Sequence, residues 1–324
     1  MTIKEISEPI QEHLEAYNNY FKSLMNSEVA LLNLVIRYIT KKKGKQVRPV
    51  LVFLSAELCG AVNRRSYVGA AMVELLHTAT LVHDDVVDEA AERRGMASIN
   101  ATWNNKIAVL IGDFLLAKGL LNSIDNNEFD FLHATSDAVR RMSEGELLQI
   151  QKSKDFNIDE KTYFKIISNK TASLIATCCQ IGAISATPDK AIQEKMKNFG
   201  ELIGTAFQIR DDIFDYQSKN TLIGKPVGND LKEKKITLPL LFAFNKVSKK
   251  SAKEFINILK RGNLKKGDIQ KILSFVNEQG GIEYAENKSK ELSEKALEII
   301  MDFKDCPAKK SLTGFCNYVT ERKK

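Results

Sequence analysis

One acidic pattern, Asp-Asp-x-x-Asp, occurs twice in this chain, at residues 84–88 and at residues 211–215. On a helix the first and last aspartates of the pattern lie one turn apart on the same side. Carboxylates placed so closely repel each other unless a cation lies between them, and burial increases that cost. Oxygen donors suit a hard cation, and Mg²⁺ commonly binds one or two carboxylates together with phosphate oxygens. Two such faces opposed across a cavity therefore predict a Mg²⁺ cluster that holds a diphosphate.

Basic residues near both motifs indicate anion binding. Arginine binds phosphate through two parallel hydrogen bonds, whereas lysine acts as a point charge. The cations exceed what one diphosphate needs, so two anionic groups are expected. His77 lies seven residues before Asp84 on the same helix face and is expected to reach the same cavity. The basic candidates are Lys45, Arg48, Arg93, Arg94, Lys170, Lys225 and Lys235.

The segments that carry the acidic motifs are predicted to be buried helices. Residues 69–87 and 199–214 are apolar nearly all round, and such helices are covered by their neighbours. Elsewhere apolar residues recur every three or four positions, strand-like alternation is missing, and only 6 prolines and 17 glycines occur in 324 residues. We expect an all-α protein, a single domain over residues 1–324 built as a bundle of long helices.

Composition excludes several classes of protein. The net charge is +7, but the lysines of the last third alternate with acids as on a solvated helix face, so no nucleic-acid partner is expected. The five cysteines have no zinc-binding spacing. No run of 18 uninterrupted apolar residues predicts a membrane span, and the first residues lack the apolar core of a signal peptide. We expect a cytoplasmic protein.

Five stretches together resemble one family, the all-trans polyprenyl diphosphate synthases (trans-isoprenyl diphosphate synthases). This resemblance implies a single-domain helical bundle around a deep central cavity, the isoprenoid synthase fold, and a homodimer. One departure is Lys234, where the family usually has glycine. The matching stretches are GKQVRP (44–49), ELLHTATLVHDDVVDEAAERRG (74–95), KTA (170–172), FQIRDDIFDY (207–216) and GKPVGNDLKEKKITLP (224–239).

The resemblance also implies a reaction, the elongation of an allylic diphosphate by isopentenyl diphosphate, with Mg²⁺ as cofactor. The metal ligands it implies are Asp84, Asp88 and Asp211. The acids expected to orient these metal ligands, or to bind water molecules on the metal, are Asp85, Asp212 and Asp215. The residues expected around the allylic diphosphate are Arg93 and Lys225, and those around isopentenyl diphosphate are Lys45, Arg48, His77 and Arg94, with Lys235 as a further substrate-binding cation. The groups expected to face the developing cation are Thr171, Gln208 and the carbonyl of Lys170.

Product length is expected to depend on the residues below Asp84. Short-chain members of the family have large aromatic side chains there, whereas this chain has Ala79 and Thr80. The small side chains predict a long product of the octaprenyl class, suited to a quinone side chain. Release of such a lipid leads us to expect transient contact with a membrane.

Other functions remain open from the sequence. A short- or medium-chain synthase, making farnesyl or geranylgeranyl diphosphate, would use the same motifs. A terpene cyclase typically has one aspartate motif and lacks the Lys45 and Arg48 pair. A metal-dependent phosphohydrolase needs more histidines than the four present. A non-catalytic partner subunit of a heteromeric synthase typically loses the aspartates that this chain keeps.

Overall fold

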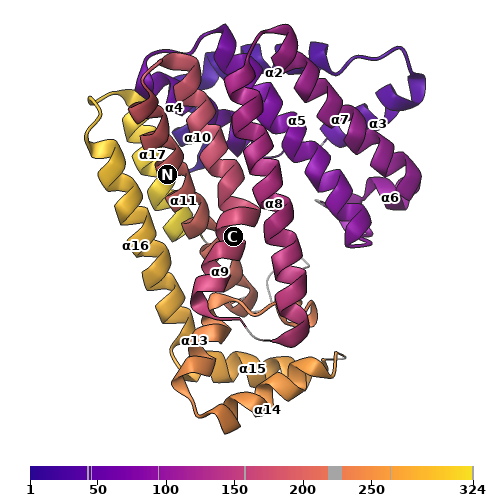
Figure 1. The fold of residues 1–324 in the computed structure, drawn as a ribbon, viewed down its shortest axis with the longest axis vertical. Coiled ribbons are helices and arrows are strands. Elements are labelled where there is room, and N and C mark those ends of the chain that lie inside the picture. Colours follow the sequence, from indigo (N-terminus) through magenta and orange to yellow (C-terminus); the bar gives the residue numbers. More distant parts are fainter. Residues whose placement is uncertain are drawn as a thin grey trace. The chain divides into compact units, whose positions relative to one another are not determined.

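Almost all of the chain is helical (Figure 1). Within the described part, the strands are β1 (Glu92–Arg93) and β2 (Met96–Ala97), which pair antiparallel. The expectation of an all-α protein is therefore confirmed. This computed structural model describes residues 1–41, 44, 46–93, 95–156, 158–217, 228–262 and 264–322.

Contacts within the chain group into two compact units. The first acidic motif belongs to unit 1 and the second to unit 2. The single domain over residues 1–324 stays a prediction. Unit 1 comprises Met1–Asp137, Ala176–Lys197 and Asp302–Phe315, and unit 2 comprises Ala138–Ile175, Asn198–Met301 and Cys316–Lys324.

Unit 1 is organised around α5, which ends in the first acidic motif. This helix packs most extensively against α7 and then against α4, so its apolar surface is covered. The helices with residues in unit 1 are α1 (Ile3–Ile6), η1 (Glu8–Ile10), α2 (Gln11–Leu24), α3 (Ala30–Lys41), α4 (Val47–Cys59), α5 (Arg64–Val87), α6 (Ile99–Thr102) and α7 (Asn105–Asp125). Helices with residues in both units are α8 (Phe129–Asp155), α10 (Ser173–Ala186), α11 (Lys190–Gln217) and α17 (Pro307–Glu321).

The close approach of α7 to α5 depends on a glycine. A Cβ atom on Gly112 would lie 2.1 Å from Nε2 of His83, so a larger residue at this position would require the His83 ring or one of the two helices to shift. Beneath this contact Leu75 and Val82 of α5 share a core with Leu115 of α7. Because protein interiors are densely packed, this core gives the acidic end of α5 a rigid support.

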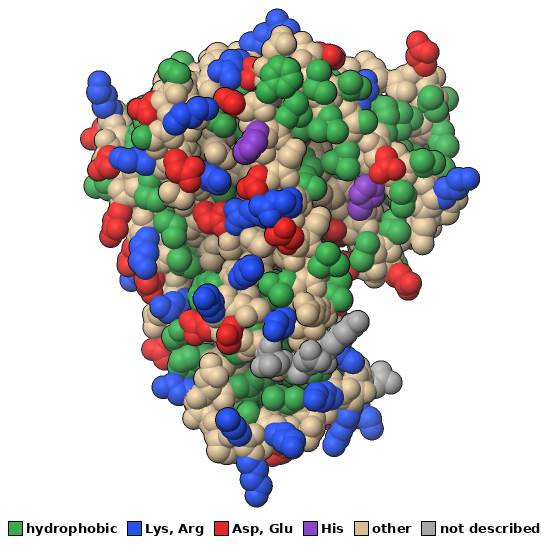
Figure 2. All heavy atoms as spheres, viewed as in Figure 1, with side chains coloured by type: hydrophobic (Ala, Val, Ile, Leu, Met, Phe, Trp, Pro, Cys, Tyr) green, Lys and Arg blue, Asp and Glu red, His purple; other side chains and the backbone are tan. Residues whose placement is uncertain are grey.

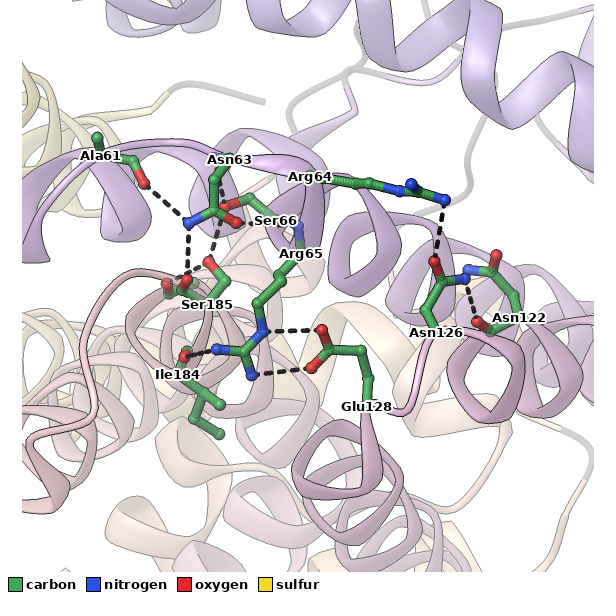
Figure 3. Close-up of polar contacts among 11 residues, drawn as sticks. Ala61, Asn63, Arg64, Arg65, Ser66, Asn122, Asn126, Glu128, Ile184 and Ser185 are labelled. Atoms are coloured by element: carbon green, nitrogen blue, oxygen red, sulfur yellow. Dashed lines mark hydrogen bonds and ion pairs between the residues drawn. The ribbon is translucent and has the colours of Figure 1, made fainter.

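The opposite end of α5 is fixed by polar contacts (Figure 3). Asn63 caps the helix by accepting from the Arg65 N–H at 2.9 Å and donates to the Ser185 carbonyl at 2.7 Å. The Arg65 guanidinium binds both carboxylate oxygens of the buried Glu128, at 2.7 and 2.8 Å, and also donates to the Ile184 carbonyl. These bonds tie the start of α5 to the start of α8 and to the end of α10.

Unit 2 supplies the second acidic motif from the last turns of α11. Its core places Ile209 and Ile213 of α11 with Leu241 of α13, and Phe255 of α14 stacks on Phe275 of α15 at 4.0 Å between ring centroids. The other elements of unit 2 are α9 (Glu160–Ile167), η2 (Ser168–Ala172, a single π-helical turn), α12 (Asn229–Lys232), α13 (Leu238–Lys246), α14 (Lys249–Lys260), α15 (Lys266–Glu278) and α16 (Gly281–Met301).

Candidate active site

The aspartates of the first motif have different surroundings. Asp84 and Asp88 are exposed, and the Asp88 N–H donates to the Asp84 carbonyl at 2.8 Å, so the two lie one helical turn apart. Asp85 is 4% exposed and accepts from Arg93 through Nε at 2.8 Å and Nη2 at 2.5 Å. Arg93 thus offsets the cost of burying the middle carboxylate, while the outer two stay at the surface.

A cavity of about 710 Å³ lies in unit 1 beside this end of α5. Its walls come from α2, α3, α5 and the β1–β2 hairpin, and its polar groups include His77, Asp85 and Arg93. Apolar side chains such as Phe21 and Leu81 line the rest. A cavity of this size, largely apolar with a few polar groups, is typical of a site for an organic ligand with a charged head.

The basic candidates of unit 1 are only partly visible. Arg48 lies half-buried in the first turn of α4, and Gln46, just before that helix, lines the cavity. Lys45 and Arg94 lie outside the described residues. The structure therefore places His77 and Arg93 at one cavity, and the assignments of Lys45, Arg48 and Arg94 stay predictions.

The proposed chain-length residues lie on α5 one turn before Asp84. Ala79 is fully buried in the core shared with α7. Thr80 is half-buried, and its hydroxyl donates to the His77 carbonyl at 2.9 Å. The cavity wall is formed instead by their neighbours Thr78 and Leu81. Control of chain length by Ala79 and Thr80 stays a prediction.

In unit 2, Asp211 of the second motif contacts the C-terminal segment. The Arg322 guanidinium donates to Asp211 at 2.5 Å and to the Phe207 carbonyl at 3.0 Å. It also lies over the Phe207 ring, 3.8 Å from the centroid, in a cation–π contact. Arg322 had no predicted role, because it lies outside the five stretches that carry the resemblance.

Asp212 is held by two donors inside unit 2. The Tyr163 hydroxyl donates to Oδ2 at 2.7 Å, and the Gln208 amide donates to Oδ1 at 2.8 Å. The Gln208 carbonyl oxygen accepts from the Thr171 hydroxyl at 2.8 Å. The structure thus brings together Thr171, Gln208 and Asp212. Tyr163 was missed because a tyrosine within a helix usually indicates core packing.

Asp215 binds the first turn of α12. Its carboxylate accepts from the backbone N–H groups of Asn229 at 2.9 Å and Asp230 at 3.0 Å. Asp230 had no predicted role, although it lies in one of the matching stretches. Lys235 forms an ion pair with Glu233, and its N–H donates to the Asp230 carbonyl at 2.8 Å.

Lys234, the departure from the family pattern, has a left-handed backbone with φ of 59°. Glycine adopts this conformation without steric cost, whereas a side chain costs about 1 kcal/mol. This chain therefore keeps the backbone turn that the usual glycine favours. Lys225 lies outside the described residues.

Lys170 and Thr171 lie on the π-helical turn η2, where the widened backbone changes the direction of side chains. Lys170 forms an ion pair with Glu146 of α8. α11 approaches this turn closely, since a Cβ on Gly204 would lie 2.7 Å from the Cα of Ala172. The close packing places Gln208, one turn further along α11, within reach of Thr171.

Burial perturbs the acids around the second motif. Loss of hydration, followed by the nearby Asp230 carboxylate, raises the pKa of Asp212 to about 7. Loss of hydration and the Asp215 carboxylate raise the pKa of Asp230 to about 6. Burial also raises the pKa of Asp215. Because these acids are buried close together, their negative charge favours either uptake of a proton or binding of a cation.

The donor set fits a hard cation shared with a ligand. Across the described ranges, no group of three histidine, cysteine or acidic side chains forms a complete metal site. Each motif instead offers aspartates spaced by one turn, and all of these donors are carboxylate oxygens. Mg²⁺ is commonly held in this way, by one or two carboxylates plus substrate phosphates.

Comparison with known proteins finds similarity along the whole chain. The family model described as polyprenyl synthetase matches residues 29–276. The octaprenyl diphosphate synthase of Escherichia coli (strain K12) is 33% identical over 324 residues, which cover 99% of each protein.

Solved structures share the fold. A decaprenyl diphosphate synthase from Rhodobacter capsulatus has a TM-score of 0.92 at 30% identity, covering 99% of each chain. A polyprenyl synthase from Caulobacter crescentus, complexed with calcium and isoprenyl diphosphate, has a TM-score of 0.91 at 30% identity, covering 100% of this chain and 98% of that one. The expected fold is thus confirmed.

The raised pKa of Asp212 predicts how stability depends on pH in chelator. The carboxyl titrates near 3.8 in the unfolded chain and near 7 in the folded protein, so the folded state binds the extra proton between these values. Its stabilising contribution is present at low pH and is lost as the pH rises through about 7. We expect Asp212→Asn to flatten the fall in unfolding temperature between about pH 5 and pH 8.

Glu278→Gln, which removes an exposed acid of the same unit, is the matched control and should keep the wild-type slope. An Asp212→Asn variant whose unfolding temperature falls with pH as steeply as that of the wild type would contradict the raised pKa.

Proposed function

The chain belongs to the polyprenyl synthetase family, and we propose that it is a long-chain all-trans polyprenyl diphosphate synthase. It elongates an allylic diphosphate with isopentenyl diphosphate, to a product of the octaprenyl class. The observation that carries this proposal is the pair of Asp-Asp-x-x-Asp motifs at the ends of two largely buried helices. Full-length similarity to an octaprenyl diphosphate synthase supports the long product.

Each cycle makes one C–C bond. The C–O bond of the allylic diphosphate breaks, and diphosphate leaves with the electron pair. The double bond of isopentenyl diphosphate then attacks the allylic cation, and a proton is lost from the adjacent carbon. We assign that proton to the released diphosphate rather than to a side chain, so no protein base is needed.

We propose Mg²⁺ as the cofactor, with Asp84, Asp88 and Asp211 as its ligands. Bound Mg²⁺ supplies Lewis acidity that stabilises the charge of the leaving diphosphate. The exposed positions of Asp84 and Asp88, one turn apart, support this role. Asp211, whose carboxylate contacts Arg322, would be the ligand from the second motif. The calcium named with the Caulobacter crescentus structure supports a divalent cation.

Arg93 can bind Asp85 and a phosphate oxygen at the same time. A guanidinium has five N–H donors, and Asp85 engages Nε and Nη2, which leaves donors for an oxygen in the cavity. We propose that Arg93 and Lys225 bind the allylic diphosphate. The residues proposed for isopentenyl diphosphate are Lys45, Arg48, His77 and Arg94, with Lys235 as an additional cation.

The groups around η2 supply negative dipole ends. We propose that Thr171, Gln208 and the Lys170 carbonyl stabilise the allylic cation as it forms. The contact between the Thr171 hydroxyl and Gln208 supports a preorganised arrangement. Dipoles that are already oriented need no reorganisation during the reaction, which is the main source of electrostatic catalysis.

We also propose a homodimer formed through α7. Val109, Leu110, Leu120 and Leu121 are each at least 40% exposed. Their spacing of 11 residues, about three turns, places them on one face, and Figure 2 shows hydrophobic side chains gathered over this part of unit 1. By length and composition α7 could cross a membrane, but its extensive contact with α5 favours a protein partner. Cytoplasmic localisation, with transient membrane contact on product release, completes the proposal.

Purified protein supplied with labelled isopentenyl diphosphate, Mg²⁺ and an allylic primer is expected to form elongated polyprenyl diphosphates. Asp84→Ala or Asp211→Ala should lower turnover by about 100-fold or more, because the charge of the leaving group loses its main stabilisation. Glu278→Ala, which removes an exposed acid on α15 outside both motifs, is the control and should keep normal turnover.

Elongated products exclude a cyclase, a phosphohydrolase and a non-catalytic subunit together. Normal turnover in either motif variant, or no elongated product from the wild type, would contradict the proposed function.

Ala79→Tyr tests the assignment of product length. We propose that the growing chain extends between α5 and α7 past Ala79, so a phenol ring in place of this fully buried methyl group should block it and shorter products should accumulate. Chromatography of the dephosphorylated products measures the chain length, and the unfolding temperature shows whether the core tolerates the ring. A folded, active variant that makes products of the original length would refute the role of Ala79.

A further inference from the structure

Four side chains of unit 2 form one continuous chain of hydrogen bonds. It runs from Thr171 on η2, through Gln208 and Asp212 on α11, to Tyr163 on α9, with donor–acceptor distances of 2.8, 2.8 and 2.7 Å. Tyr163 and Asp212 are buried, at 3% and 5% exposure, whereas Thr171 and Gln208 are half-buried. The chain therefore connects a buried carboxylate to a hydroxyl that is partly open.

The chemistry of the Gln208 amide fixes the direction of the two hydrogen bonds that it makes. The Gln208 nitrogen can only donate, so Asp212 accepts from it, and the Gln208 oxygen can only accept, so the Thr171 hydroxyl donates to it. Each hydrogen thus points towards Asp212. The oxygen of Thr171 is left with its lone pairs directed away from Gln208. Polarised chains of this kind strengthen along their length in a low-dielectric interior.

Tyr163 occupies the other side of the carboxylate. Its hydroxyl donates to Oδ2, while Gln208 donates to Oδ1, so the two donors fix both oxygens of Asp212. The Tyr163 ring is locked by burial and by edge-on contact with Phe164, 5.4 Å between centroids. Without the hydroxyl, the carboxylate could rotate about its terminal torsion, and the Gln208 amide would lose its fixed partner.

We propose that Tyr163 is a positioning residue for the condensation. Through Asp212 it holds the Gln208 amide in one orientation, and this keeps the oxygen of Thr171 electron-rich where positive charge develops on the allylic substrate. The inference rests on the proposed function, because it needs a cationic stage of the reaction. It assigns a role to a tyrosine that touches neither substrate.

Tyr216 provides a matched control in the same unit. It is also buried, at 7% exposure, and its hydroxyl lies 2.7 Å from the hydroxyl of Thr237, away from this chain of hydrogen bonds. Tyr163→Phe and Tyr216→Phe therefore each remove one buried hydrogen bond and keep the ring. A merely structural role for Tyr163 predicts that the two variants behave alike.

The test compares two allylic diphosphate analogues, each titrated with Mg²⁺ present. One is an unreactive thiolodiphosphate that is neutral at the reacting carbon, and the other has an ammonium group at that position and mimics the cation. For Tyr163→Phe we expect kcat to fall about 10- to 100-fold, the range typical of lost supporting contacts. The Kd of the ammonium analogue should rise by the same factor, since binding of a transition-state mimic follows catalysis.

For Tyr163→Phe, the Kd of the thiolo analogue and the KM for isopentenyl diphosphate should stay within about twofold of wild type. For Tyr216→Phe, kcat, the KM for isopentenyl diphosphate and the Kd values of both analogues should all stay within about twofold of wild type. Equal losses for the two analogues, or a Tyr163→Phe enzyme that matches Tyr216→Phe, would overturn the positioning role. A wild-type protein that makes no elongated product would overturn the proposed function, and the positioning role with it.

Discussion

Six carboxylates crowded near the ends of two largely apolar helices are the constraint on which this structure depends. In each motif the second aspartate is buried, and it is bound by side chains of its own unit. Asp85 is paired with Arg93, and Asp212 accepts from Tyr163 and Gln208. The first aspartate of each motif lies nearer the surface, where a cation can offset the repulsion.

The same crowding of carboxylates explains why backbone N–H groups, as well as side chains, donate hydrogen bonds to these aspartates. Asp215 accepts from two backbone amides in the first turn of α12, and so the start of that helix is bound to the second motif. Asp211 accepts from Arg322, which ties the C-terminal segment to the motif. Charges that we propose to act in the reaction thus also bind neighbouring segments of the chain.

The sequence was enough to predict the fold class, the family and the location of the two motifs, because these depend on helical periodicity and on local spacing. The grouping of Thr171 with Gln208 also followed from motifs, although they are 37 residues apart. Tyr163 and Arg322 could not be predicted, since their roles arise only when distant helices pack. At Lys234 the sequence showed only that a lysine replaces the glycine usual in the family. The structure adds that this residue has the left-handed backbone that glycine favours.

The central proposal is that Mg²⁺ held by the aspartates of each motif is required for binding of the diphosphate. Calorimetric titration with the unreactive thiolodiphosphate tests it directly, in Mg²⁺ and in chelator. We predict one analogue bound per chain in Mg²⁺, with binding lost in chelator and lost equally when either Asp84→Asn or Asp211→Asn is introduced. Binding that survives the loss of one motif unchanged would contradict the claim.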